Sequence, residues 1–180
     1  MARLRKFVCY RKTERPYTRF SKYKQKSYVR SRPVCKVVRF DMGDHKMYDF
    51  GVHLIATARI QIRDNAIEAA RQSANRLLEK TLGKNGFNFQ VRMYPHHVLR
   101  ENPLASGAGA DRLSTGMAHS FGKTIGIAAQ VREGQPILSL YVAKNNVDLA
   151  RKALHRAGHK LPMKQKIVVE EVVKKVITTK

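Results

Sequence analysis

Apolar residues recur along most of this 180-residue chain with the spacing of regular secondary structure. In residues 64–82 they fall three or four positions apart, which is the period of one helix face. Asp64 is suited to cap the start of this helix, and Gly83 is a natural stop. A second helix is predicted to follow Asn146 as its cap and to end at Gly158.

The segment 87–93 shows a clean alternation of apolar and polar residues. Phe87, Phe89, Val91 and Met93 share one side of the expected strand, which is typical of a strand with one buried face. An aromatic stripe can also serve as a stacking platform for RNA bases. At this spacing a core role is more common, so we predict that these side chains are buried.

Further strands are predicted where apolar runs are bounded by turn residues. They are 34–40, followed by a turn at 41–44; 52–62, with a bend near Ala56; 125–131 and 137–142, joined as a hairpin around 133–136; and 164–169. The order is strands, helix, strand, long loop, strands, helix, strand. This order predicts an α+β fold in which two helices pack on one face of a mostly antiparallel sheet.

The charge of the chain indicates its class of partner. There are 36 Lys and Arg against 13 Asp and Glu, which gives a formal net charge of +23. A small domain needs a net charge of only about 2–8 to stay in solution. The surplus repels itself unless a polyanion neutralises it, which argues against a compact metabolic enzyme and favours a nucleic-acid partner. No apolar run approaches the roughly 20 residues that cross a bilayer, so no membrane partner is expected.

Residues 1–33 form a basic arm without an apolar period of either kind. In the first 32 positions, 12 basic residues stand against one acid, Glu14. Aromatic residues lie between these charges, where they can pack or stack once phosphates neutralise the arm. We predict an arm that becomes ordered on RNA. Its predicted RNA contacts are Arg3, Arg5, Lys6, Arg11, Lys12, Arg15, Arg19, Lys22, Lys24, Lys26, Arg30 and Arg32.

A long loop is predicted at 101–123, which is rich in small residues and lacks a helix or strand period. Loops beyond about 12–15 residues are uncommon and are usually functional or disordered. Small residues let the backbone approach another backbone closely. Arg112, His119 and Lys123 can meet phosphates. The loop is therefore predicted to act as a finger that enters folded RNA.

Two glycine patterns within this loop do not fit nucleotide-binding sites. Five residues separate Gly116 from Gly122, whereas a phosphate-binding loop needs four and must follow a buried strand. Arg112 occupies the third glycine position of a dinucleotide fingerprint that would begin at Gly107. Neither pattern supports nucleotide hydrolysis or a dinucleotide cofactor.

The cysteines and histidines do not form a convincing metal or catalytic site. Cys9 and Cys35 are too far apart in sequence for the closely spaced pair of a zinc site. His96 and His97 are adjacent, and adjacent residues on an extended chain point apart. No catalytic residue, metal ligand or cofactor is therefore predicted.

Several motifs occur in an order that is specific to one family. They are 68–71 with 74–75, then 83–87, then 91–100, and then Ala110-Asp111-Arg112, Gly116-Met117 and Phe121-Gly122-Lys123. Over about 34–169 the chain resembles the L-ten-e ribosomal proteins of the large subunit, the archaeal and eukaryotic branch of the universal L-sixteen family. It departs from that pattern at Ala118, where the family carries Arg.

The resemblance implies an α/β-hammerhead-type fold and a place on large-subunit rRNA near the aminoacyl-tRNA site. It implies neighbouring ribosomal proteins as partners, a cytoplasmic ribosome as location, late joining of the subunit, and no homo-oligomer. It places Arg92 within the RNA-binding set. In the family, the loop that matches 101–116 points toward bound tRNA. The tRNA-proximal residues implied here are Ser106, Gly107, Gly109 and Asp111.

Together these features predict a non-enzymatic RNA-binding protein with three parts. The parts are a basic arm at 1–33, one α+β domain at 34–170, and a basic tail at 171–180. Two alternatives remain open at this point. One is a basic DNA- or RNA-binding factor outside the ribosome, and the other is a phosphate-handling enzyme that uses Gly116–Thr124.

Overall fold

The computed structural model describes residues 8–18, 23, 25, 29, 31–101, 107–109 and 122–172. Its helices are α1 (Val8–Arg11), α2 (Asp64–Leu82), the short 3₁₀ helix η2 (Lys144–Asn146) and α4 (Val147–Gly158). Its strands are β1 (Asp41–Gly43), β2 (Phe50–Ala56), β3 (Ile60–Arg63), β4 (Asn88–Val91), β5 (His97–Glu101), β6 (Lys123–Val131), β7 (Pro136–Val142) and β8 (Gln165–Glu171). All pairs among these strands are antiparallel, and the α+β class is confirmed.

A five-stranded sheet in the order β1-β4-β7-β2-β8 carries the main core. One row of apolar side chains crosses it, because each residue lies opposite the next on the neighbouring strand. The row is Met42, Phe89, Leu140, Val52 and Val169. Its three central members are fully buried. The sheet therefore presents a continuous apolar face to the helices.

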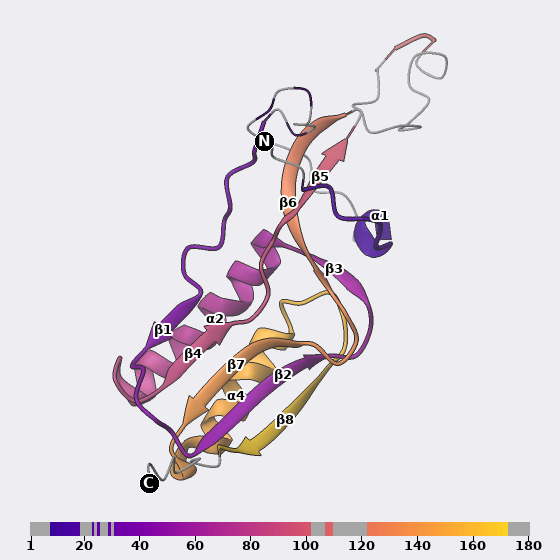
Figure 1. The fold of residues 1–180 in the computed structure, drawn as a ribbon. Coiled ribbons are helices and arrows are strands. Elements are labelled where there is room, and N and C mark those ends of the chain that lie inside the picture. Colours follow the sequence, from indigo (N-terminus) through magenta and orange to yellow (C-terminus); the bar gives the residue numbers. More distant parts are fainter. Residues whose placement is uncertain are drawn as a thin grey trace, which may run out of the picture.

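Helices α2 and α4 pack against each other and against this face (Figure 1). Ile67, Ala74 and Leu78 of α2 and Ala153 and Leu154 of α4 are fully buried within the same core. Both predicted helices are confirmed. Gly83 ends α2 with a φ of 70°, a value that L side chains rarely adopt.

The apolar stripe predicted at 87–93 belongs to the core, as expected. Phe87, Phe89, Val91 and Met93 are each at most 2% exposed. Of the two roles open to an aromatic stripe, burial is the one that this sheet uses.

A second sheet, in the order β3-β6-β5, leaves the body and projects away from it (Figure 1). The single strand predicted at 52–62 is two strands, one in each sheet, and the expected bend lies at 57–59. The backbone of Ala56 fixes this corner. Its N–H donates to Gln135 O at 3.0 Å, and its carbonyl accepts from Gly134 N at 2.9 Å.

The hairpin predicted between 125–131 and 137–142 is wrong. These segments form β6 and β7, but β6 pairs with β3 and β5, whereas β7 pairs with β4 and β2. The turn at 132–135 carries the chain from one sheet to the other. Turn residues between two apolar runs fit either connection, so local sequence does not distinguish them.

The strand predicted at 34–40 is also wrong, because α2 takes the hydrogen bonds that a neighbouring strand would supply. Lys36 N donates to Asp64 Oδ2 and Val38 N donates to Glu68 Oε2, each at 3.2 Å. Strand pairing begins only at β1, within the segment predicted to turn. Asp64 is accordingly the first helical residue rather than the cap, which is Arg63.

Strand β5 was not predicted. It pairs with β6, and the register shifts between Leu99 and Arg100. Val98 and Leu99 are both buried, so neighbouring apolar residues interrupt the alternation that marks a strand.

Candidate nucleic-acid interface

The arm is attached to the three-stranded sheet through its backbone. Gln61 Nε2 on β3 donates to Lys12 O, and Gln130 Nε2 on β6 donates to Glu14 O at 3.0 Å. Val98 N on β5 donates to Tyr17 O at 3.0 Å. Each strand of the sheet thus holds one carbonyl of the arm.

His97 adds a fourth attachment at the edge of the same sheet. Its Nδ1 accepts the Tyr17 N–H at 2.8 Å, so Nδ1 carries no proton and Nε2 must carry it. Burial lowers the pKa of His97, and the nearby Arg100 guanidinium lowers it further, although Glu14 opposes them. The neutral ring that the hydrogen bond requires is therefore the favoured form at neutral pH.

Apolar and cation–π contacts complete the attachment. Val29 is buried against Val98 and Ile127, and Tyr17 packs on this cluster. The Arg100 guanidinium lies 3.8 Å from the centre of the Tyr17 ring. The arm thus contributes a small core of its own at the second sheet.

The docking uses backbone groups and a few apolar side chains, and it leaves exposed the four arm cations that the structure describes. Arg11, Lys12, Arg15 and Arg32 are all exposed. Their predicted role as RNA contacts stays a prediction. The other predicted arm contacts lie outside the described residues, namely Arg3, Arg5, Lys6, Arg19, Lys22, Lys24, Lys26 and Arg30.

Strands β5 and β6 lead into the long loop, of which the structure describes 107–109 and 122–123. Lys123 is exposed at the start of β6, directly opposite Glu101. Gly107 and Gly109 have φ values of 133° and 82°, which favour glycine. The segment 107–109 lies beyond the outer end of the second sheet (Figure 1). Four predicted site residues of this loop fall outside the described part: Ser106, Asp111, Arg112 and His119.

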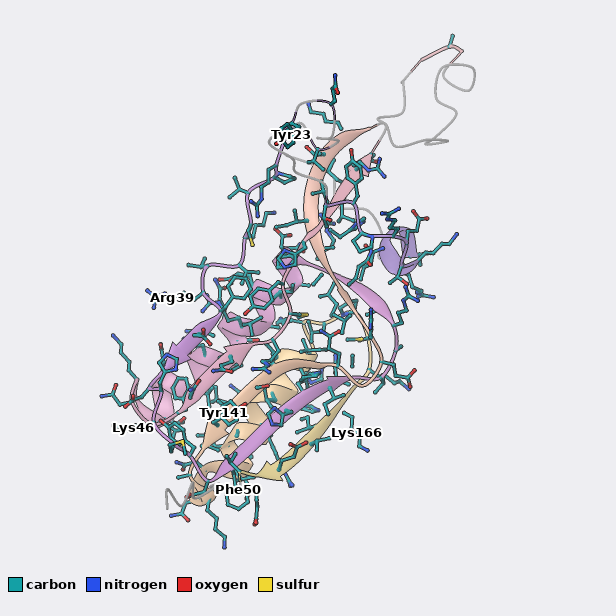
Figure 2. All side chains as sticks on the ribbon, in the orientation of Figure 1. Tyr23, Arg39, Lys46, Phe50, Tyr141 and Lys166 are labelled. Carbon is teal, nitrogen blue, oxygen red and sulfur yellow. The ribbon has the colours of Figure 1, made fainter. Side chains whose placement is uncertain are left out.

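The body adds a broad cationic surface. Arg39, Lys46 and Lys166 point away from it at widely separated places (Figure 2). Arg92, predicted to bind RNA, is also exposed and donates to Gln90 Oε1 at 3.3 Å. If each of the 13 Asp and Glu carboxylates neutralised one cation, 23 of the 36 Lys and Arg charges would still have no counter-charge in the chain.

Two carboxylates cannot neutralise cations on that surface, because they are buried within the fold. Asp64 is 3% exposed and Glu68 is 9% exposed, and both hold the segment that precedes β1. Glu68 also accepts two hydrogen bonds from Arg71, at 2.8 Å from Nε and 2.5 Å from Nη2. The bond to Arg71 is the main reason that the pKa of Glu68 lies below its usual range. This pair borders a cavity of about 670 Å³ between α2 and β1.

The open face of the five-stranded sheet carries a Ser–His–Glu row without the geometry of a hydrolase. His53 Nδ1 lies 2.9 Å from Ser139 Oγ, and its Nε2 lies 4.0 Å from Glu170 Oε2. Burial lowers the pKa of His53, although Glu170 opposes this. The long contact to a largely exposed carboxylate does not orient the ring as a catalytic base requires.

The described ranges hold no group of three or more His, Cys, Asp or Glu side chains that could bind a metal ion. Within the same ranges, none of the helices has both the length and the apolar character needed to cross a membrane. His96 and His97, considered together in the sequence, make separate contacts. His97 turns to the arm, and the ring of His96 stacks with that of Tyr94.

The sequence predicted the cations of the interface but not the side chains that attach the arm to the second sheet. Gln61, Gln130 and His97 hold the arm, yet each looks like an ordinary polar residue in or near a strand. Gln61 gives one usable signal in the sequence, since it lies between Ile60 and Ile62 in a β segment. In the structure it is only 4% exposed. A buried amide needs hydrogen-bond partners, but sequence does not say which segment supplies them.

Comparisons with known proteins agree with this geometry. The family model described as ribosomal protein L16p/L10e matches residues 14–168, which include part of the arm. Proteins named large ribosomal subunit protein uL16 are similar along nearly their whole length. The Methanocella arvoryzae protein is 47% identical over 164 residues, which are 89% of this chain and 95% of the relative.

Two further archaeal relatives give the same picture. The uL16 of Methanococcus aeolicus is 47% identical over 168 residues, covering 92% of this chain and 94% of its own. That of Archaeoglobus fulgidus is 44% identical over 164 residues, covering 90% of each chain. The resemblance drawn from the sequence motifs is thereby confirmed. The chain belongs to the ribosomal protein L16p/L10e family.

Proposed function

We propose that this chain is a structural constituent of the large ribosomal subunit and that its cationic arm and surface bind large-subunit rRNA. The observation that carries this proposal is the excess of 23 positive charges on a member of a ribosomal protein family. The arm is docked through backbone groups and keeps Arg11, Lys12 and Arg15 exposed, which suits contact with phosphates. Membership of this family makes the protein a structural one and not an enzyme.

The finer parts of the proposal concern the place of the protein in the subunit. The loop 101–123 is proposed to approach tRNA near the aminoacyl-tRNA site, with Ser106, Gly107, Gly109 and Asp111 closest to it. Neighbouring ribosomal proteins are its other proposed partners, and it would join the subunit late in assembly. The second sheet supports this assignment, because it carries the loop away from the core on paired strands rather than on a flexible tether.

Sedimentation tests the main proposal. In a lysate with high magnesium, the tagged full-length chain should travel with the large subunit on a sucrose gradient. A chain that stays near the top of the gradient, while other large-subunit proteins sediment, would favour a nucleic-acid-binding factor outside the ribosome. The same fractions report whether the protein appears only in nearly complete particles, as late joining requires.

The arm should account for a measurable part of the salt dependence of RNA binding. We expect the triple variant Arg11→Ala, Lys12→Ala and Arg15→Ala to reduce the slope of log K against log salt by about 2 to 3, because each lost phosphate contact removes about 0.7 to 0.9. Filter binding to an rRNA fragment at several salt concentrations measures this slope. Thr13→Ala, a neutral change in the same segment, should leave it unchanged. Equal slopes for the triple variant and the wild type would remove the arm from the interface.

The loop should matter for translation more than for attachment. Deletion of 104–114 is expected to leave the protein in the large subunit, because the arm and body supply the phosphate contacts. It should lower the polysome fraction or delay subunit maturation, which polysome profiles detect. Normal profiles in cells that depend on this variant would contradict the proposed role of the loop.

A further inference from the structure

An exposed stack of rings lies where the five-stranded sheet passes into β5. The centres of the Phe40 and Tyr94 rings are 4.8 Å apart with an interplanar angle of 29°, and those of Tyr94 and His96 are 5.9 Å apart at 19°. Tyr94 is 53% exposed, and His96 is exposed as well. Large aromatic surface left in water is unusual unless it meets a partner.

The backbone holds these rings in place. His96 N donates to Tyr94 O at 3.0 Å, which closes a tight turn around Pro95. Pro95 fixes its own φ, so the turn has little freedom. Tyr94 and His96 therefore form a preformed platform, and a ligand that stacks on it does not have to order the rings first.

A cavity of about 330 Å³ adjoins the platform at His96. It is lined by Thr18, Arg32, Pro95, His96, Val98 and Ile127. Val98 and Ile127 belong to the small core between the arm and the second sheet, so the floor of the cavity is apolar and fixed. Its volume lies near the lower end of the roughly 300–1,000 Å³ that small-molecule sites span.

The lining matches the chemistry of one nucleotide. An aromatic wall at His96 and an apolar floor suit the two faces of a base, and the Thr18 hydroxyl offers hydrogen bonding at its edge. The Arg32 guanidinium can meet a phosphate or stack on the base. Arg39 and Arg92, both exposed, lie in sequence one residue before Phe40 and two before Tyr94. An acidic polymer fits these surroundings better than a protein segment does.

We propose that this cavity receives a single unpaired nucleobase of rRNA, which stacks on His96 while Arg32 meets its phosphate. The inference rests on the proposed function and specifies one base contact within that interface. His96 is the central residue, because it is the one ring shared by the stack and the cavity. Recognition is of an unstacked base, since a base held in a helix could not enter.

The test compares a variant that lacks the aromatic ring at position 96 with one that keeps an aromatic ring there, both within the assembled subunit. Large subunits are isolated from cells whose only copy of the protein is wild type, His96→Ala, His96→Phe or the control His159→Ala, an exposed histidine at the end of α4. The rRNA is probed with dimethyl sulfate and a ribose-acylating reagent. One unpaired nucleotide should become more reactive in His96→Ala and not in His96→Phe or His159→Ala. Loss of one stack is expected to weaken the docking of that base by about 5- to 150-fold.

A second variant covers the case in which His96→Ala does not accumulate. Thr18→Phe places a ring in the mouth of the cavity and leaves the stack intact, so it should displace the same base and raise the reactivity of the same nucleotide. Unchanged rRNA reactivity in whichever of these two variants is present in the subunit would overturn the inference and would point to a protein side chain or to an empty cavity. If the wild-type protein itself failed to sediment with the large subunit, the proposed function would fail instead.

Discussion

The Phe89→Ala variant should lose about 3–5 kcal/mol of its free energy of unfolding. Phe89 is fully buried and lies within the apolar row, between Met42 on β1 and Leu140 on β7. Removing its ring takes away contacts with both sheet neighbours and with the helices that cover them. The surrounding row is held by backbone pairing and cannot close the space. Urea denaturation of the isolated full-length chain measures the loss.

The same variant also separates the two roles that an aromatic stripe can have. Met47→Ala is the control, because Met47 is 77% exposed and its replacement should change stability by less than about 0.5 kcal/mol. A Phe89→Ala protein that kept wild-type stability but bound rRNA weakly would contradict the core assignment and favour a stacking role.

The successes and failures of the sequence predictions have a common physical basis. Helix α2 and the stripe at 87–93 were predicted because their period is set by one large apolar face that the core requires. The segment 34–40 has equally good strand composition, yet its backbone bonds to Asp64 and Glu68 on α2. Backbone N–H and C=O groups need hydrogen-bond partners, but the local pattern of apolar residues does not predict which segment supplies them.

The connection between β6 and β7 shows the same limit at the level of topology. Each strand has the expected composition, but the turn between them is bonded to Ala56, about 80 residues earlier in the chain, and the two strands pair in different sheets. A long-range contact of this kind leaves no mark in the turn itself. Strand β5 was not predicted for a related reason. Its alternation of apolar and polar residues is interrupted next to the register shift between Leu99 and Arg100.

For the candidate interface, net charge predicted the class of partner, but the sequence did not predict where the cationic segments lie in the fold. An excess of 23 cations names the class of partner from composition alone. Sequence treated the arm as separate from the body, whereas Gln61, Gln130 and His97 fasten its 12–17 segment to the second sheet. The aromatic platform was missed because His96 was considered together with His97 for a metal or catalytic site, and not together with Tyr94 for stacking.

The second large effect is expected at the buried pair of Glu68 and Arg71. Their side chains are 11% and 10% exposed, and Glu68 also accepts the N–H of Val38. Glu68→Ala would leave the Arg71 guanidinium buried without its counter-charge and would release the segment before β1. Breaking one partner of a buried pair costs about 3–5 kcal/mol, and we expect a loss near the lower end of that range. Urea denaturation measures it, with Glu133→Ala, an exposed carboxylate in the turn at 132–135, as the control.

Replacing both partners should lower the free energy of unfolding less than replacing Glu68 alone. The double variant Glu68→Leu with Arg71→Met removes the two charges together, so no buried charge remains, and it should regain part of the loss. The N–H of Val38 would still lack its acceptor, which sets a floor of about 1–3 kcal/mol on the remaining loss. A double variant no more stable than Glu68→Ala would show that Glu68 acts through Val38 and not through Arg71.

The contribution of Glu68 to the free energy of unfolding should depend on pH in the acid range. The Arg71 hydrogen bonds hold the pKa of folded Glu68 below its ordinary value of 4.5, so folding favours the charged form. The stability that this carboxylate contributes is therefore fully present above pH 4.5 and is lost as the pH falls through the lower, folded-state pKa. The difference in unfolding free energy between the wild type and Glu68→Gln should shrink over that acid range. A difference that stayed constant from neutral pH to pH 3 would mean that folding does not lower the pKa of Glu68.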